Sequence, residues 1–262
     1  MLLSYTFRVM TAVLYGTLRG ITGAGWKKCV LCSHKIPAFL PWRGGFSTAP
    51  PIIQALHMVG SDIDHFACPR CGSTDRERHL YLYLTRTGIA NSFCGKRVLH
   101  FAPEYQLSTW ISSLEPSEYI LGDLFPSTPP IQKINIEAIP FPDGYFDYLI
   151  ANHVLEHVAN LTCAISEITR VLNINGIAIL QTPWCKKLSK TIEDQAVIDP
   201  YSRLHLFGQE DHVRIFGQDI YTVLSNENLI PSPIAHNDIL HDINQDYYGV
   251  NIEEDFMIFQ RK

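Results

Sequence analysis

The chain has 262 residues, of which 46% are hydrophobic and 18% are charged, and its formal net charge is −5. This composition excludes a disordered or fibrous protein, and the length allows one large domain and a small module. Residues 1–95 contain ten Lys/Arg and four Asp/Glu, whereas residues 96–262 contain eleven and twenty-two. A basic N-terminal part suits either an anionic surface or compensation of a negatively charged metal site.

The first segment, residues 1–28, is predicted to be a helix and a linker. One helical face collects its apolar side chains, namely Leu3, Phe7, Met10, Leu14, Leu18 and Ile21. Arg8 and Arg19 interrupt the segment, so we expect neither a signal peptide nor a membrane-spanning helix. The apolar face is expected to pack on the protein itself or on a partner. Peripheral membrane contact by residues 2–21 is the alternative.

Two C-x-x-C pairs, Cys29/Cys32 and Cys68/Cys71, are separated by 35 residues. Four thiolates in this arrangement suit a closed structural Zn²⁺ site, so we predict a zinc-ribbon-like module over residues 29–73. Iron bound by the same ligands, or two reduced pairs without metal, are the alternatives. The odd total of seven cysteines argues against a disulfide framework, and we therefore expect a cytoplasmic location.

From residue 74 onwards the sequence predicts a domain of alternating helices and strands, residues 74–262. Thr74-Asp75-Arg76-Glu77 is a capping box that opens a helix, and Gly88 ends that helix. Apolar runs predict strands at 97–101, 118–121, 131–136, 146–152 and 177–180, with helices over 104–114 and 161–172. The alternation indicates an α/β fold with a doubly wound, largely parallel sheet. Ligands are then expected at the carboxyl ends of the strands, around residues 101–104, 123 and 152–155.

Residues 153–157 read HVLEH, which matches the H-x-x-E-H pattern of one class of zinc peptidases. That chemistry requires both histidines on one turn of a helix. His153 instead follows directly on the apolar strand FDYLIAN, so it is expected at a strand end or in a loop. We therefore predict no peptidase and no metal pair between His153 and His157. His157 is expected to pack against, or cap, the helix that follows.

The segment FPDGYFDYLIANHVLEHV, followed by an amphipathic helix and RVLNINGIAILQTP, resembles class I S-adenosylmethionine-dependent methyltransferases of the methyltransferase type 11 group. VLHFAPE, CPRCGSTDRERHLYLYL and FGQEDHVRIFG resemble motifs of a subgroup with a zinc knuckle, and EDFMIFQRK resembles the last antiparallel strand. The resemblance implies a Rossmann-like, mostly parallel seven-stranded sheet. It also implies S-adenosylmethionine as the cofactor.

The resemblance further implies which residues contact the cofactor. The loop His100, Phe101, Ala102, Pro103 and Glu104 would pass under the methionine part. Asp123 and Leu124 would meet the ribose, and Asn135, Ile136 and Glu137 the adenine. Asn152, His153 and Val154 would line the methyl-transfer pocket. The sequence departs from the family in lacking a glycine-rich first loop and in having Asn135 where aspartate is common.

Methyl transfer to an OH or NH group requires an aligned acceptor and removal of a proton. The candidates for catalysis are His153 and His212, with Asp211 as an orienting partner; His205 is a further histidine of interest. Arg214 could hold an anionic substrate, or Asp211 and Arg214 could form a structural ion pair.

The predicted function is methylation of a small molecule such as a sugar, a lipid precursor or another metabolite. An RNA methyltransferase is the first alternative, favoured by the basic N-terminal part and disfavoured by the acidic catalytic part. A protein that binds S-adenosylmethionine without catalysis is the second.

Overall fold

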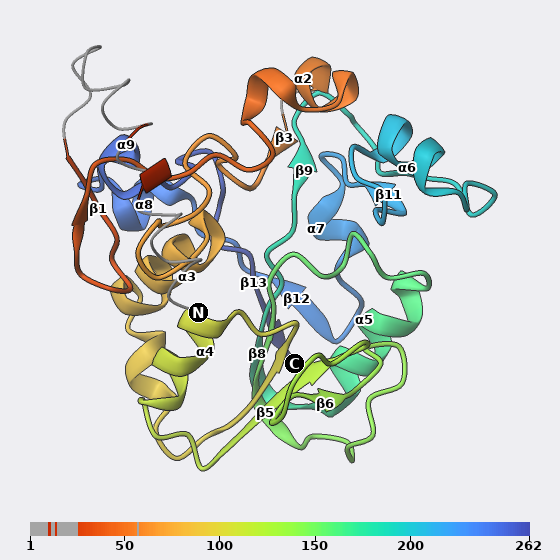
Figure 1. Ribbon diagram of the computed structural model, residues 1–262. Helices are drawn as coiled ribbons and strands as arrows, with labels where there is room; N and C mark the ends of the chain where they lie inside the picture. The colour runs from red at the N-terminus through yellow and green to blue at the C-terminus, as the bar shows by residue number, and fades with distance from the viewer. Residues whose placement is uncertain (1–9, 12–13, 15–25, 57) are drawn as a thin grey trace.

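The computed structural model describes residues 10–11, 14, 26–56 and 58–262. Its centre is a seven-stranded sheet with the order β12-β13-β8-β7-β4-β5-β6 (Figure 1). The strands are β4 (Arg97–Phe101), β5 (Glu118–Asp123), β6 (Gln132–Lys133), β7 (Phe146–Ala151), β8 (Leu172–Ile179), β12 (Leu229–Pro231) and β13 (Ile258–Arg261). Strand β13 is antiparallel to both neighbours, and the remaining pairings are parallel. The predicted Rossmann-like, mostly parallel sheet is confirmed.

Helices cover both faces of this sheet. The described helices are α2 (Pro51–Leu56), α3 (Asp75–Arg86), α4 (Tyr105–Ser112), α5 (Leu161–Val171), α6 (Pro200–Phe207), α7 (Ile220–Val223), α8 (His236–Leu240) and α9 (Gln245–Tyr248), with 3-10 turns η1 (Phe46–Thr48) and η2 (Ile89–Ser92). Val98 and Ile150 pack with α3 and α4, while Leu99 and Leu149 pack with α5 and α7. Figure 1 shows these two pairs of helices on opposite sides of the sheet. Successive residues of a strand face opposite sides of the sheet. Because helices cover both sides, the residues on both must be apolar, as the continuous runs of β4 and β7 indicate.

Local sequence signals explain where the helices begin. The Thr74 side chain accepts from the Glu77 backbone N–H, and the Glu77 carboxylate accepts from the Thr74 N–H, so the predicted capping box opens α3. Gly88 follows α3 in the left-handed conformation, with φ 77°. The Asn160 side chain caps α5 by accepting from the Cys163 N–H.

Two strands differ by several residues from their predicted extents, whereas β5 and β7 differ by one or two residues at the end. The strand predicted at 131–136 is limited to Gln132–Lys133, because the Asn135 side chain accepts from the Glu137 N–H and folds the chain into a turn. The strand predicted at 177–180 begins earlier, at Leu172. Asn175, with φ 62°, and Gly176 form an irregularity inside β8, where a Cβ on Gly176 would lie 2.8 Å from the Asn173 carbonyl oxygen.

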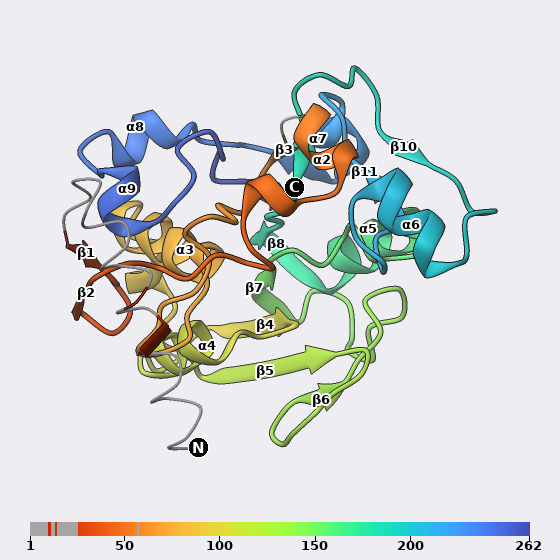
Figure 2. The same ribbon diagram turned by 45° about the horizontal axis from the view of Figure 1, so that its top comes forward.

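The N-terminal part contains β1 (Lys27–Lys28) paired with β2 (Lys35–Ile36), followed by η1, α2 and β3 (Met58–Val59). Strand β3 pairs with β9 (Trp184–Cys185), which directly follows the central sheet. Helix α2 packs against α6, and Figure 2 shows the two helices side by side. Strand β10 (Ile192–Glu193) pairs with β11 (Arg214–Ile215) near α6. The boundaries predicted at 28/29 and 73/74 stay predictions, since residues 51–59 pack on Cys185, Phe207 and Ile215 of the α/β part.

The helix predicted within residues 1–28, and membrane contact by residues 2–21, lie outside the described residues except for Met10, Thr11 and Leu14. In the part of the chain that the structure describes, every helix is too short or too polar to cross a bilayer.

Candidate active site

The sheet reverses its strand order next to β4, since the chain runs from β4 outwards to β6 and returns to β7 on the other side. Parallel sheets bind ligands at such a point, outside the carboxyl ends of the strands. Ala102–Glu104 follow β4, and Asn152–Val154 follow β7. The two loops meet, because the Asn152 side-chain amide donates to Glu104 Oε1 at 2.7 Å.

Glu104 offers a carboxylate oxygen at this point. Its Oε2 is buried and has no hydrogen-bond partner among the described residues, although His100 Nε2 lies 3.4 Å away. His100 is fully buried and holds Tyr119 Oη through Nδ1 at 2.8 Å. Burial raises the pKa of Glu104, but the neighbouring His100 outweighs it and the net shift is downward. Glu104 is therefore a carboxylate with one oxygen available to a donor.

Of the predicted loop His100–Glu104, only the last three residues reach the surface. His100 and Phe101 point into the protein, with 0% and 2% exposure. Ala102 is exposed and has φ 46°, a left-handed conformation that glycine adopts more readily than alanine. The structure thus places His100 behind Glu104 and assigns Phe101 to the core.

The predicted ribose and adenine positions lie at the ends of β5 and β6. Asp123 is half-buried and accepts from the Phe125 N–H through Oδ1 at 2.7 Å. Leu124 is 45% exposed. Asp123 Oδ2 is thus the atom suited to a hydroxyl donor.

The polar side chains of Asn135 and Glu137 accept from backbone N–H groups, one within this turn and one in the loop before α5. Asn135 is exposed and its Oδ1 is used in the turn described above, while Ile136 is buried. Glu137 Oε1 accepts from the Asn160 N–H at 2.7 Å. An adenine contact by Glu137 would compete with this bond.

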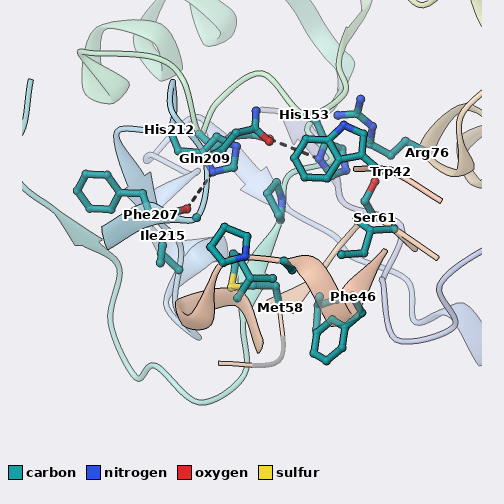
Figure 3. A pocket seen from close by; sticks show the side chains of 18 of the residues that line it. Trp42, Phe46, Met58, Ser61, Arg76, His153, Phe207, Gln209, His212 and Ile215 are labelled. Carbon is teal, nitrogen blue, oxygen red and sulfur yellow. Dashed lines mark hydrogen bonds and ion pairs between the residues drawn. The ribbon is translucent and has the colours of Figure 1, made fainter. Parts of the chain in front are cut away.

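A cavity of about 220 Å³ lies beside His153 (Figure 3). Three parts of the chain line it. The N-terminal part gives a largely apolar wall that includes Trp42, Phe46, Met58 and Phe66; the loop after β7 gives His153, Glu156 and His157; and the segment after α6 gives Gln209 and His212. Figure 3 shows Arg76, Trp42 and His153 grouped at one end, and Phe207 and Ile215 at the other. The cavity combines an apolar wall with a few polar groups, as small-molecule sites do.

His153 lies between two buried carboxylates. Its Nδ1 is 3.4 Å from Glu156 Oε1, and its Nε2 is 3.8 Å from Glu254 Oε1. Its backbone is in the left-handed region, with φ 55°, and its N–H donates to the Gln181 carbonyl. Burial and the charge of Arg76 lower the pKa of His153, but the two carboxylates outweigh them and the net shift is upward. The pair of carboxylates therefore favours a charged imidazolium fixed in place.

A buried polar chain continues behind His153. Glu254 Oε2 lies 2.8 Å from His79 Nδ1, and His79 Nε2 lies 2.9 Å from His236 Nδ1. Burial, followed by the charge of His79, lowers the pKa of His236 to about 4. The chain thus places a neutral His236 at the end of a string of ionisable groups.

The cluster predicted around residues 211–214 is assembled differently. Asp211 Oδ2 lies 3.3 Å from His157 Nδ1, whereas His212 Nδ1 lies 3.2 Å from the Phe207 carbonyl oxygen. Asp211 therefore orients His157 and not His212. The prediction that His157 caps the next helix is wrong, because Asn160 is that cap; His157 lines the cavity. Burial lowers the pKa of His212.

Arg214 is 2% exposed and serves the structure. It donates to the Leu155 and Val158 carbonyls at 2.7 and 2.5 Å, and it forms an ion pair with Glu193 at 2.9 Å. The predicted pairing with Asp211 is thus replaced by one with Glu193, and the guanidinium is already satisfied by these acceptors. His205 is exposed on α6 and holds the Tyr201 carbonyl.

Sequence reasoning missed the N-terminal wall of the cavity and Arg76. The wall comes from the Pro/Gly-rich stretch around Trp42, which has no periodicity to interpret. Arg76 Nε is buried without a hydrogen-bond partner among the described residues, and its guanidinium lies 5.7 Å from the Phe66 ring centroid. In the sequence, a charged residue in the first turn of a capped helix does not indicate that its side chain lines a cavity.

The four predicted metal ligands meet at one point. Their sulfur atoms lie within 4.8 Å of one another, with Cys29 and Cys71 at 3.8 Å and Cys32 and Cys68 at 4.0 Å. Tetrahedral Zn–S bonds of about 2.3 Å place sulfur atoms about 3.8 Å apart, so the spacing fits zinc. Burial raises the pKa of the Cys32 thiol to about 12, while the neighbouring Cys68 and Cys71 lower the pKa of Cys29. Four such thiols ionise together only around a cation.

Comparison with known proteins identifies the central part. Residues 111–180, from the end of α4 to the end of β8, match the family model of a methyltransferase domain. These residues thus carry the sequence pattern of a methyltransferase domain. No curated protein matches the chain. By this match the protein is a methyltransferase. The sequence resemblance implies S-adenosylmethionine as its methyl donor.

Solved structures similar to this methyltransferase include two bacterial proteins. The YcgJ protein of Bacillus subtilis is 16% identical, covers 70% of this chain and 98% of its own, and has a TM-score of 0.42. An S-adenosylmethionine dependent methyltransferase of Mesorhizobium loti is 10% identical, covers 69% and 97%, and has a TM-score of 0.47.

Proposed function

We propose that this methyltransferase transfers the methyl group of S-adenosylmethionine to a small molecule bound in the cavity beside His153. One observation carries the proposal: the cavity opens directly at the carboxyl end of β7, next to the strand ends where such sheets bind their cofactor. Its volume of about 220 Å³ and its aromatic wall suit a metabolite-sized acceptor.

The groups at the strand ends fit the cofactor. S-adenosylmethionine supplies an electrophilic methyl group on a sulfonium, together with an ammonium, a ribose and an adenine. Glu104 Oε2, buried and without a hydrogen-bond partner among the described residues, suits the ammonium. Asp123 Oδ2 suits the ribose hydroxyls. Asn152 fixes Glu104 from the opposite loop.

His153 is assigned a shaping and orienting role. Both of its ring nitrogens face carboxylates, of Glu156 and Glu254, so neither is directed at an acceptor. Arg76 is the cation at the same end of the cavity, and its Nε lacks a partner among the described residues. An acceptor that carries an anionic group suits this position.

The Cys29, Cys32, Cys68 and Cys71 cluster is proposed to hold a structural Zn²⁺. The sulfur spacing supports zinc, and all four thiolates are used, which leaves no open position for chemistry. The ion would fix the two loops that flank the Trp42–Phe66 wall, one before it in the chain and one after it.

A cavity-filling variant tests the proposal. Ala49→Phe fills the apolar wall of the cavity, away from the cofactor groups. We expect methylation of a metabolite extract with isotopically labelled S-adenosylmethionine to fall at least ~10-fold, because the added ring occupies space that the acceptor would fill; a tenfold loss corresponds to ~1.4 kcal/mol of barrier. Cofactor affinity by calorimetry should stay unchanged. Ile174→Phe, at an exposed position outside the cavity, is the matched control.

Other outcomes would overturn the proposal. Label that appears in RNA and not in metabolites, with salt-dependent RNA retention, indicates an RNA methyltransferase. Cofactor binding without any labelled product indicates a protein that binds S-adenosylmethionine without catalysis. Equal loss of activity in both variants would show that the cavity is not the acceptor site.

A further inference from the structure

We infer that Glu156, His157 and His212 form a binding site for a divalent transition-metal ion on the wall of the acceptor cavity. Each offers one ligand atom, and the three atoms lie within 4.8 Å of one another. All three residues line the cavity. This site is separate from the four cysteines and differs from them in ligand chemistry.

The ring nitrogens of the two histidines are already divided between two tasks. His157 Nδ1 lies 3.3 Å from the Asp211 carbonyl oxygen and 3.3 Å from Asp211 Oδ2. His212 Nδ1 lies 3.2 Å from the Phe207 carbonyl oxygen. Each Nδ1 can therefore donate, which leaves each Nε2 as the atom with a lone pair. Metal-binding histidines show this same division, with the second nitrogen held by a carboxylate or a carbonyl.

The carboxylate is held in the same way. Glu156 is 2% exposed, and its Oε2 accepts from Thr182 Oγ1 at 2.8 Å. Its Oε1 lies 3.9 Å from His157 Nε2 and 3.4 Å from His153 Nδ1. Ligand atoms around a tetrahedral ion with bonds of about 2.0–2.1 Å lie ~3.4 Å apart. Binding therefore requires the cluster to contract by about 1 Å.

The backbone keeps the ligands together without the ion. The Val213 N–H donates to the Glu156 carbonyl at 3.0 Å, which joins the two segments that carry the ligands. Arg214 fixes the turn from behind through the Leu155 and Val158 carbonyls. The two imidazole rings meet edge to face, with centroids 4.8 Å apart and an angle of 78°. The arrangement is thus pre-formed by contacts that are independent of any metal.

The ligand set selects the class of ion. Two imidazoles and one carboxylate suit Zn²⁺, Fe²⁺, Co²⁺ or Mn²⁺, whereas Mg²⁺ and Ca²⁺ prefer oxygen ligands. Three protein ligands leave at least one coordination position open, as in catalytic metal sites.

This role of the ion rests on the proposed function. An ion in this position would bind a hydroxyl or carboxylate oxygen of the acceptor and would favour loss of the hydroxyl proton. The acceptor class is therefore an oxygen-containing metabolite able to ligate a metal.

The site also changes the interpretation of HVLEH. Its first histidine, His153, contacts Glu156 and is not one of the three ligands. Residues 152–158 lie outside any helix, as expected for a His153 that follows directly on a strand. The third ligand comes from residue 212, which no local pattern connects with the motif.

Metal titration tests the inference without any activity assay. Full-length protein with zinc on its four cysteines is dialysed free of loosely bound metal and titrated with CoCl₂, followed by calorimetry and visible absorption. We expect one Co²⁺ per chain to bind without a thiolate-to-cobalt absorption band, because the ligands are nitrogen and oxygen. His157→Gln and His212→Gln should each weaken this binding by at least ~100-fold, because losing only a partner of a ligand already costs ~10–100-fold.

His241→Gln, at an exposed histidine outside the cluster, is the matched control and should bind Co²⁺ like the wild type. Circular dichroism verifies that the variants are folded, and using two separate histidines keeps the test valid if one variant fails to fold. The inference is overturned if the wild type binds no Co²⁺, or if both folded variants bind Co²⁺ as tightly as the wild type. If Co²⁺ binds as expected while Ala49→Phe leaves methylation unchanged, the proposed acceptor site fails and the metal site stands.

Discussion

The guanidinium carbon of Arg78 lies 3.8 Å from the centroid of the Phe39 ring. Arg78 lies in α3 of the catalytic part, and Phe39 packs with the cysteines of the N-terminal part. The fully buried guanidinium also donates to five backbone carbonyls, those of His65, Phe66, Ser73, Tyr248 and Gly249. One side chain thus joins the cysteine module, α3 and the segment after α9.

Replacing Arg78 should therefore destabilise the whole chain. Arg78→Met removes all five hydrogen bonds and leaves buried carbonyls without donors, so we expect a loss of ~3–5 kcal/mol in the free energy of unfolding. Chemical denaturation measures it. Arg86→Met, on the same helix, removes only a half-exposed ion pair with Asp242 and should cost under ~1 kcal/mol. Similar losses in both variants would contradict this assignment.

The four-cysteine site should bind one metal ion that Cys68→Ser removes. The serine oxygen is a poor substitute for a buried thiolate, so metal content should fall by one ion per chain and the unfolding temperature should drop. Elemental analysis and thermal unfolding measure both quantities. Cys94→Ser, at an exposed cysteine, should change neither. Unchanged metal content in Cys68→Ser would refute the site.

Cofactor affinity should depend on Asp123. Asp123→Asn keeps the shape but removes the charge at the end of β5, so we expect the dissociation constant of S-adenosylmethionine to rise ~10-fold or more. Calorimetry measures it directly. Asp246→Asn, exposed on α9, serves as the control with the same chemical change. Binding that is equal in all three proteins would remove Asp123 from the cofactor site.

His236 should make stability depend on pH. Its folded pKa of about 4 lies below the ordinary value of 6.5, so the unfolded chain takes up the proton first on acidification. The stabilising contribution is therefore complete above pH 6.5 and is lost as the pH falls towards 4. His79 faces His236 directly, and Glu254 and Tyr83 border it. Unfolding free energies between pH 4 and 8 should slope less steeply in His236→Gln than in the wild type, whereas His241→Gln should follow the wild type.

The sequence predicts the parts of this fold that depend on neighbouring residues. The capping box at Thr74 and Glu77 indicated the start of α3, and the apolar run at Phe146 indicated a strand covered on both faces. The predicted extent of β6 was wrong because the Asn135 side chain accepts from the Glu137 N–H, which favours a turn over a longer strand. Local patterns of this kind describe short-range preferences only.

The candidate site was only partly predictable for the same reason. The four cysteines and the strand ends have recognisable spacing, and the structure brings each set together. The cavity is lined by residues more than a hundred positions apart in the chain, such as Trp42 and His212. Asp211 was assigned to the adjacent His212, but tertiary packing turns it to His157. No sequence pattern reports such a choice of partner.

The pairing of β3 with β9 joins two outer lengths of the chain, one before and one after the central strands in the sequence. The groups proposed to hold the methyl donor all lie in one continuous stretch, residues 102–154, whereas most of the cavity wall comes from before residue 77 and after residue 182. Donor and acceptor recognition therefore belong to different lengths of the polypeptide. Exchanging the two outer lengths between related enzymes would transfer acceptor preference as a unit, with the donor site left intact.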